Sequence, residues 1–259
     1  MVTIVKDVIC HRELLAMLVA RNIKIRYKES VLGFLWTLLG PLLLIGIYAL
    51  FLGIMRFSIS MPLLVTGIFV WQYLAMTLGD STNAIVGNAN LIQKAAFPRV
   101  LLPLSIVLAN LVNLLLSLII VGIYLVFTNV SFGMPLWLCV AIVSQMALCI
   151  GLSLLLSAAN VFFRDVQHVI GVLMMAWFFV TPVIYSPVMV LQTFSDPRLH
   201  QLFYLNPMTG LLALYRNALM GEAMPQANLW IPSLAVSWLM LAAGVVVFQK
   251  LQRSFADEL

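Results

Sequence analysis

The chain has 259 residues, of which 63% are hydrophobic and only 9% are charged, whereas about a quarter of an ordinary globular protein is charged. This composition excludes an ordinary soluble domain, and it excludes intrinsic disorder because disordered chains are rich in charge and poor in apolar residues. The mean hydropathy of +1.09 is that of a membrane protein. Since a helix needs about 20 apolar residues to cross the roughly 30 Å hydrocarbon core, six spans would use about half of the chain and leave no room for a separate catalytic domain.

Residues 1–29 form a basic, amphipathic segment ahead of the first long apolar run. At helical spacing, one broad face collects the apolar side chains Leu14, Leu15, Leu18, Val19 and Ile25. We predict a helix at the membrane surface, which serves either as a lipid anchor or as a gating element. The apolar stretch after Arg12 stops at Arg21, which is too short for a cleavable signal, so the N-terminus is expected to stay with the mature protein.

The gaps between charged residues outline the membrane spans. A 26-residue gap separates Glu29 from Arg56, and a 64-residue gap before Arg164 has the length of two helices, with turn formers between them at residues 129–135 (NVSFGMP). We predict an all-α membrane protein, with a single transmembrane domain over residues 1–259 and six spans at residues 31–55, 63–79, 101–127, 136–162, 166–186 and 229–248.

The lysine and arginine residues segregate to one side of this map. Eleven of the 14 lie in the N-terminal segment, in the connections at 80–99 and 163–165, and in the C-terminal tail; the other side holds Arg56, Arg198 and Arg216. The positive-inside bias therefore predicts that both termini and residues 80–99 are cytoplasmic and that residues 187–227 are outside. The same bias explains the net charge of +5 without a nucleic-acid partner.

Two connections are predicted to carry structure of their own. Residues 80–99 are too polar for lipid but long enough for a short surface helix, which either docks into a partner or is a solvated loop. Residues 187–227 contain four prolines and apolar runs too short to span, as expected of re-entrant helices. Within them, Asn206 and Pro207 suit a helix start, and Arg216 is predicted to be structural, pairing with a helix end or a lipid headgroup.

Several classes of function are disfavoured by what the spans lack. Ionisable residues are missing from their middles, which argues against an ion-coupled carrier, and no ring of charges indicates a channel. No catalytic constellation and no GxxxxGK[ST] loop occurs, so the chain cannot hydrolyse ATP by that route. The cysteines Cys10, Cys139 and Cys149 have no metal-like spacing and are interpreted as small buried apolar residues.

Three sequence blocks resemble the permeases of polysaccharide-exporting ABC transporters of the ABC-2 type. Residues 21–41, RNIKIRYKESVLGFLWTLLGP, resemble the family's approach to its first span, and residues 88–103, NANLIQKAAFPRVLLP, its cytoplasmic loop and third span. Residues 204–221, YLNPMTGLLALYRNALMG, are similar to its extracytoplasmic re-entrant region and follow TPVIYSP at 181–187. The resemblance implies a homodimeric permease with two ATP-binding subunits, which exports undecaprenyl-linked O-antigen, capsular or teichoic polymers across the bacterial inner membrane.

The resemblance also implies roles for particular residues. Residues 83–97 would be the coupling helix that docks into the ATPase, through Asn88, Asn90, Leu91, Lys94, Phe97 and Arg99. Residues 1–29 would be the interface helix beside the cytoplasmic entrance. Four of its basic residues would contact a lipid pyrophosphate, or would alternatively only anchor the helix at the membrane: Arg21, Lys24, Arg26 and Lys28.

An aromatic lining would suit a polymer path, because sugar rings stack on aromatic faces through their C–H groups and can slide along them. Helical spacing offers the candidates Phe34, Trp36, Tyr48, Phe69, Tyr73, Trp177, Phe178 and Tyr185. The alternative is that these side chains face lipid or lie at the membrane interface.

The combined prediction is the permease subunit of an ATP-driven exporter of lipid-linked polysaccharide such as O-antigen. It would be a multi-pass inner-membrane protein that acts as a homodimer. The chain itself would be no enzyme and would hold no metal or cofactor, because ATP and Mg²⁺ would bind to the partner subunits. An ABC-type drug or lipid efflux permease and a proton-coupled secondary transporter remain as alternatives.

Overall fold

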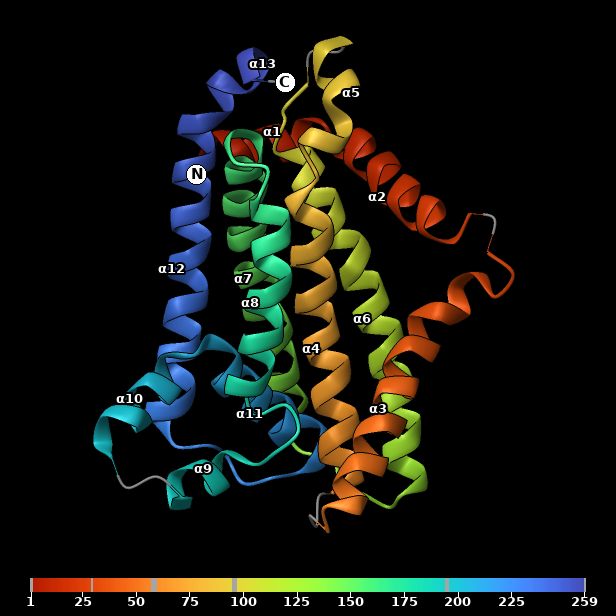
Figure 1. The fold of residues 1–259 in the computed structure, drawn as a ribbon, viewed down its shortest axis with the longest axis vertical. Coiled ribbons are helices and arrows are strands. Elements are labelled where there is room, and N and C mark those ends of the chain that lie inside the picture. The colour runs from red at the N-terminus through yellow and green to blue at the C-terminus, as the bar shows by residue number, and fades with distance from the viewer. Residues whose placement is uncertain (1, 29, 57–59, 95–96, 194–195, 259) are drawn as a thin grey trace.

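The structure is a computed structural model that describes residues 2–28, 30–56, 60–94, 97–193 and 196–258. Within these ranges all regular secondary structure is helical, which confirms the all-α prediction (Figure 1). The elements are α1 Val2–Cys10, α2 Arg12–Tyr27, η1 Gly33–Leu35, α3 Trp36–Ile54, α4 Met61–Thr82, η2 Val86–Asn88, α5 Ala89–Lys94, α6 Leu101–Phe127, α7 Pro135–Phe162, α8 Val166–Val180, α9 Pro187–Thr193, α10 Pro197–Leu205, α11 Pro207–Met220, α12 Ala227–Leu251, η3 Gln252–Ser254 and α13 Phe255–Glu258.

Five of the described helices, α3, α4, α6, α7 and α12, are long and apolar enough to cross a membrane. The fifth predicted span, at residues 166–186, corresponds to α8, which has 15 residues and ends at Val180 instead of at residue 186. Thr181 precedes Pro182 and is extended (φ −89°, ψ 138°), because a residue before proline avoids the helical region. At about 1.5 Å per residue α8 is roughly 22 Å long, shorter than the hydrocarbon core, so the count of six crossings stays a prediction.

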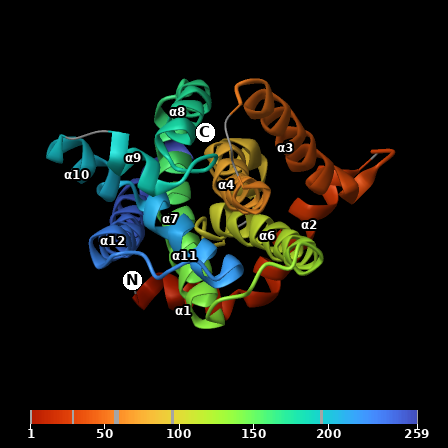
Figure 2. The same ribbon diagram turned by 90° about the horizontal axis from the view of Figure 1, so that it is seen from below.

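The chain ends and the short helices are divided between the two ends of the bundle. The chain termini, α1, α5 and α13 lie at one end, here called the basic end, while α9 and α10 lie at the opposite end (Figure 1). The half-length helix α11 packs between α4, α7 and α12 near that second end (Figures 1 and 2). The arrangement agrees with the sequence map, in which residues 80–99 and both termini share a side and residues 187–227 lie on the other.

The N-terminal segment differs from its prediction as a single amphipathic helix. It is two helices, with a break at His11 (φ −111°, ψ 28°). Leu15 and Leu18 are buried as predicted, but Ile25 is 60% exposed. The packed stripe of α2 instead continues through Asn22 and Arg26, because these polar side chains find partners on α6 and α4.

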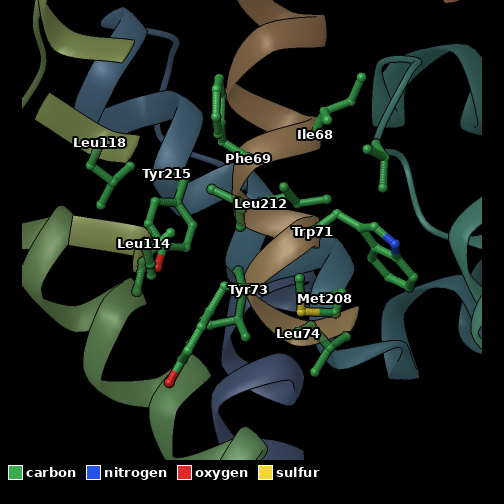
Figure 3. Close-up of a cluster of buried hydrophobic side chains, with 14 of the residues drawn as sticks. Ile68, Phe69, Trp71, Tyr73, Leu74, Leu114, Leu118, Met208, Leu212 and Tyr215 are labelled. Atoms are coloured by element: carbon green, nitrogen blue, oxygen red, sulfur yellow. The ribbon is translucent and has the colours of Figure 1, made fainter. Parts of the chain in front are cut away.

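Two apolar clusters hold the bundle together. The larger one joins α4, α6, α7 and α11, and Figure 3 shows its centre, where side chains from α4 meet Leu114 and Leu118 of α6 and Met208, Leu212 and Tyr215 of α11. The smaller cluster lies at the basic end and joins Leu15 and Leu18 of α2 to the start of α6 and the ends of α7 and α12. Of the three cysteines only Cys149 is buried; Cys10 and Cys139 are exposed, so their interpretation as buried residues is wrong.

Helices α7 and α12 cross at two glycines. A Cβ atom added at Gly244 would lie 2.2 Å from the carbonyl oxygen of Gly151, and one added at Gly151 would lie 2.3 Å from that of Met240. Both distances are far inside van der Waals contact. The absence of side chains here lets the two backbones touch, which is how small residues bring membrane helices together.

The variant Gly151→Ala is expected to lower the thermal unfolding temperature of the detergent-solubilised protein by about 3–10 °C. Overpacking of a tight contact costs about 1–3 kcal/mol, and each kcal/mol corresponds to about 2–4 °C in a chain of this size. Gly122→Ala in α6 is the matched control, since its new Cβ would meet no atom within 4 Å. Equal unfolding temperatures for the two variants would contradict the assigned crossing.

Candidate functional site

At the basic end, α2 is fastened to the bundle by side-chain hydrogen bonds. Arg21 donates through Nη2 to Oδ1 of Asn88 (2.6 Å), next to α5, and Asn22 donates through Nδ2 to the hydroxyl of Ser105 on α6 (2.9 Å). Because these partners lie far apart in the sequence, the bonds fix the position of α2 relative to two other elements. The α2 network denotes Arg21, Asn22 and Arg26 together with their partners Asp80, Asn88, Ser105 and Asn110.

Arg26 forms the third attachment of the α2 network, in a closed ring with Asp80 and Asn110. Its Nη1 donates to Oδ1 of Asn110 (2.7 Å) and its Nη2 pairs with the carboxylate of Asp80; Asn110 in turn donates through Nδ2 to the same carboxylate (3.1 Å). The side chains of Arg26 and Asp80 are 23% and 42% exposed. A pair this accessible adds only about 0–1 kcal/mol of stability. The ring links α2 to both α4 and α6 through one side chain on each helix.

The predicted coupling segment at residues 83–97 folds as a short 3₁₀ turn, η2, followed by the six-residue helix α5, and residues 95–96 lie outside the described ranges. Leu91 and Phe97 turn inward and pack on the basic-end cluster, while Asn90 and Lys94 are exposed. Asn88 links the connecting segment to α2. Its Nδ2 donates to the carbonyl of Ala84 in the segment (2.8 Å), and its Oδ1 accepts from Arg21 of α2.

Arg99 ties the same segment to the end of α12. Its Nη1 donates to the backbone carbonyl of Gln252, just beyond the last residue of α12. A displacement of the segment would therefore reach α12 through Arg99 and α2 through Asn88.

Three of the predicted aromatic residues come together between α3, α4 and α8. The ring of Tyr48 stacks on Phe178 with centroids 5.5 Å apart. Trp71 meets Trp177 and Phe178 edge to face, at 6.0 and 5.5 Å. Trp71 was missed by pattern reasoning, which considered only the pair Phe69 and Tyr73 on α4.

The other predicted aromatic residues lie elsewhere. Phe69 and Tyr73 are buried in the large cluster (Figure 3), and Trp36 is 50% exposed at the start of α3. The hydroxyl of Tyr185 donates to the carbonyl of Phe179 (2.9 Å). The side chain of Phe34 is outside the described residues. Within one chain the seven candidates whose side chains the structure describes therefore do not form one continuous surface.

Near the second end, Arg216 lies on α11 with none of its surface exposed. Its guanidinium donates to three backbone carbonyls in the turn after α8: Nη2 to Pro182 (2.7 Å) and Val183 (3.1 Å), and Nη1 to Tyr185 (3.3 Å). This confirms the predicted pairing with a helix end and not with a lipid headgroup. Gly67 permits the approach, since a Cβ there would lie 2.2 Å from the Val183 oxygen.

Asn206 joins the same two elements. Its Oδ1 accepts from the backbone N–H of Met208 (3.1 Å), which caps α11 as predicted, and from Nε1 of Trp177 (2.9 Å). Its Nδ2 donates to the hydroxyl of Thr181 (2.9 Å). Asn206 and Arg216 thus hold α11 to the end of α8 by buried hydrogen bonds, which are strong where water is excluded.

A further buried contact links three helices and was not predicted. Gln145 of α7 donates through Nε2 to the carbonyl of Val70 on α4 (2.9 Å) and accepts from the hydroxyl of Tyr215 on α11 (2.8 Å). The available signal was its position, since it is the only glutamine in the uncharged stretch 100–163. A buried polar side chain in such a stretch needs partners on neighbouring helices.

The structure thus has a bundle of apolar helices whose polar connecting segment is hydrogen-bonded to α2. The chain belongs to the ABC-2 type transporter family, whose model matches residues 13–220. The matched region runs from the first turn of α2 to the last residue of α11. It therefore includes the α2 network and the hydrogen bonds of Asn206 and Arg216.

Similar proteins extend the match to the whole chain. It is 34% identical over 268 residues to the O-antigen export system permease protein RfbA of Myxococcus xanthus, with all of both chains covered. Two proteins of the same description from Klebsiella pneumoniae are each 29% identical, over 95% of this chain and 94% of their own length.

Proposed function

We propose that this chain is the permease subunit of an ATP-driven exporter that moves O-antigen, linked to an undecaprenyl diphosphate carrier, across the bacterial inner membrane. The observation that carries the proposal is the similarity over the entire length to permeases described as O-antigen exporters. The ATP and Mg²⁺ would be bound by two partner ATPase subunits. Both termini and α5 would face the cytoplasm.

In this proposal residues 83–97 receive the movement of the ATPase. The exposed Asn90 and Lys94 would contact the partner, while Leu91 and Phe97 pack inward on the basic-end cluster. Because Asn88 accepts from Arg21, a push on α5 would move α2. The α2 network would thus connect ATP hydrolysis to the cytoplasmic entrance.

The polymer path would lie between two copies of the chain. Helices α3 and α8 lie on opposite sides of α4 (Figure 2), and each has an exposed apolar face. The exposed side chains include Leu43, Ile47, Leu50 and Phe51 on α3 and Val172, Met175 and Phe179 on α8. A second copy would cover part of these faces. In the aromatic group between the same two helices and α4, Phe178 is buried while Tyr48 and Trp177 are only partly buried. Tyr48 and Trp177 are therefore the members of this group best placed to border the path.

The carrier's diphosphate would be met by basic residues of α2. Lys24 and Lys28 are exposed there, and Arg21 and Arg26 hydrogen-bond Asn88, Asn110 and Asp80. A diphosphate would have to replace Asp80 to engage Arg26.

The direct test deletes the gene for this chain and follows the polymer by immunoblotting of surface and cytoplasmic fractions. We expect surface O-antigen to disappear and lipid-linked polymer to accumulate inside, with recovery when the wild-type gene is returned. A strain whose partner ATPase carries an inactivated Walker lysine should show the same retention. Unchanged surface polymer in the deletion strain would refute the proposed function.

A further inference from the structure

A cavity of about 250 Å³ opens at the end of the bundle opposite to the basic end. Its floor is apolar, formed by Ala213 of α11 and Leu229 of α12. Its other lining residues come from the start of α9, from Tyr204 of α10, from residues 222–226 between α11 and α12, and from Asn228 in the first turn of α12. Segments from four helices therefore enclose one recess, next to the turn that Arg216 holds in place.

The polar side chains that line this cavity can all form hydrogen bonds with hydroxyl groups. They comprise one carboxylate, two carboxamides, one phenol and one hydroxyl: Glu222, Gln226, Asn228, Tyr204 and Ser186. No basic side chain is among the lining residues that the structure describes, which disfavours an anionic ligand such as a phosphate. These groups can donate to and accept from hydroxyls, while an aromatic ring and an apolar floor receive the C–H faces of a ring.

We propose that this cavity binds one or two neutral sugar units of the exported polymer as it leaves the transporter. The combination of a tyrosine face, carboxylate and amides suits a polyhydroxylated ring, and the volume lies just below the about 300–1,000 Å³ of sites that hold drug-sized ligands. The inference rests on the proposed function for the identity of the polymer. It adds a contact point within a single subunit, separate from the aromatic group between α3, α4 and α8.

Binding to the complete transporter in lipid nanodiscs tests the site. The probe is the O-polysaccharide of the same cells, released from its lipid by mild acid and titrated by calorimetry. Removal of an aromatic anchor costs on the order of tenfold in affinity, so Tyr204→Ala should raise the Kd about tenfold. Tyr204→Phe should change it by less than about twofold, because the ring face and not the hydroxyl makes the stacking contact.

Two further variants separate the site from its surroundings. Gln192→Ala is the control, because Gln192 is exposed on the neighbouring helix α9 and does not line the cavity; its Kd should equal that of the wild type. Asn228→Ala, at an exposed position, should weaken binding several-fold and keeps the test open if Tyr204→Ala fails to fold.

Three results would overturn the proposal: no binding by the wild type, equal affinities for Tyr204→Ala and Gln192→Ala, or displacement by phosphoethanolamine, which would identify the ligand as an ammonium headgroup. The deletion experiment above is independent of these results. Loss of surface polymer in the deletion strain together with unaltered binding by Tyr204→Ala would leave the export function standing and remove only this site.

Discussion

Replacement of Arg216 with leucine is expected to lower the thermal unfolding temperature of the detergent-solubilised protein by about 5–10 °C. The substitution removes the donors for three carbonyls in the turn after α8. Hydrogen bonds to charged groups contribute about 1.5–3 kcal/mol each to stability. Leucine carries no charge that must be desolvated on burial, and this gain offsets part of the stability lost with the hydrogen bonds. A net cost of about 2–3 kcal/mol corresponds to this shift.

Two variants define what the Arg216 result means. Arg216→Lys should fall between the wild type and Arg216→Leu, since an ammonium lacks the fork that reaches Pro182 and Tyr185 from separate nitrogens. Arg198→Ala on α10 removes an exposed arginine and should shift the unfolding temperature by less than about 2 °C, as surface substitutions do. If Arg216→Leu matches Arg198→Ala in differential scanning fluorimetry, the carbonyl contacts do not hold α11 to α8.

The variant Arg21→Gln is expected to reduce polymer exported per ATP hydrolysed by about tenfold while ATP hydrolysis by the complex continues. The bond from Arg21 to Asn88 is the direct side-chain link from α2 to the segment proposed to meet the ATPase. A hydrogen bond to a charged group contributes at least about 1.5 kcal/mol, and the loss of this amount corresponds to a change in coupling of roughly tenfold. Phosphate release and polymer translocation are measured in the same proteoliposomes.

The control for the lost charge is Arg12→Gln, which removes an exposed arginine from the same helix and should leave the ratio within about twofold. A double-mutant cycle with Asn88→Ala separates the two roles of Arg21. If Arg21 acts through Asn88, the double variant exports as much polymer per ATP hydrolysed as the more impaired single variant. If the two effects multiply, Arg21 acts elsewhere, as it would by binding the carrier's diphosphate.

The positions of the long helices could be predicted from sequence because the membrane imposes them. Charged residues cannot be left in hydrocarbon, so the charge-free gaps delimit α6 and α7 to within a residue of their predicted ranges. The start of α11 was also predictable, since Asn206 and Pro207 are local signals for a helix N-terminus. The early end of α8 was signalled by Thr181 and Pro182, and the apolar run that continues through Val183 and Ile184 concealed it.

The site residues were less predictable, because their partners lie far apart in the sequence. Hydrophobic periodicity assigned Ile25 to the packed face of α2, but Asn22 and Arg26 occupy that face through bonds to Ser105, Asp80 and Asn110. Pattern reasoning placed Phe69 and Tyr73 in a path, and within one chain both side chains are buried, so their place in a path stays a prediction. A periodic pattern shows which side chains share a face, not what covers that face.

The sequence by itself determined that the chain is a helical membrane protein, where its long helices run, and which family it resembles, since hydropathy, charge and local motifs act within one segment at a time. Only the tertiary structure decided that Arg21 reaches Asn88, that Arg216 reaches the end of α8, and that Tyr204 and Glu222 line the same cavity. These pairings join residues from different helices. They depend on how the helices are rotated and how closely they approach, which glycines such as Gly67 and Gly151 allow.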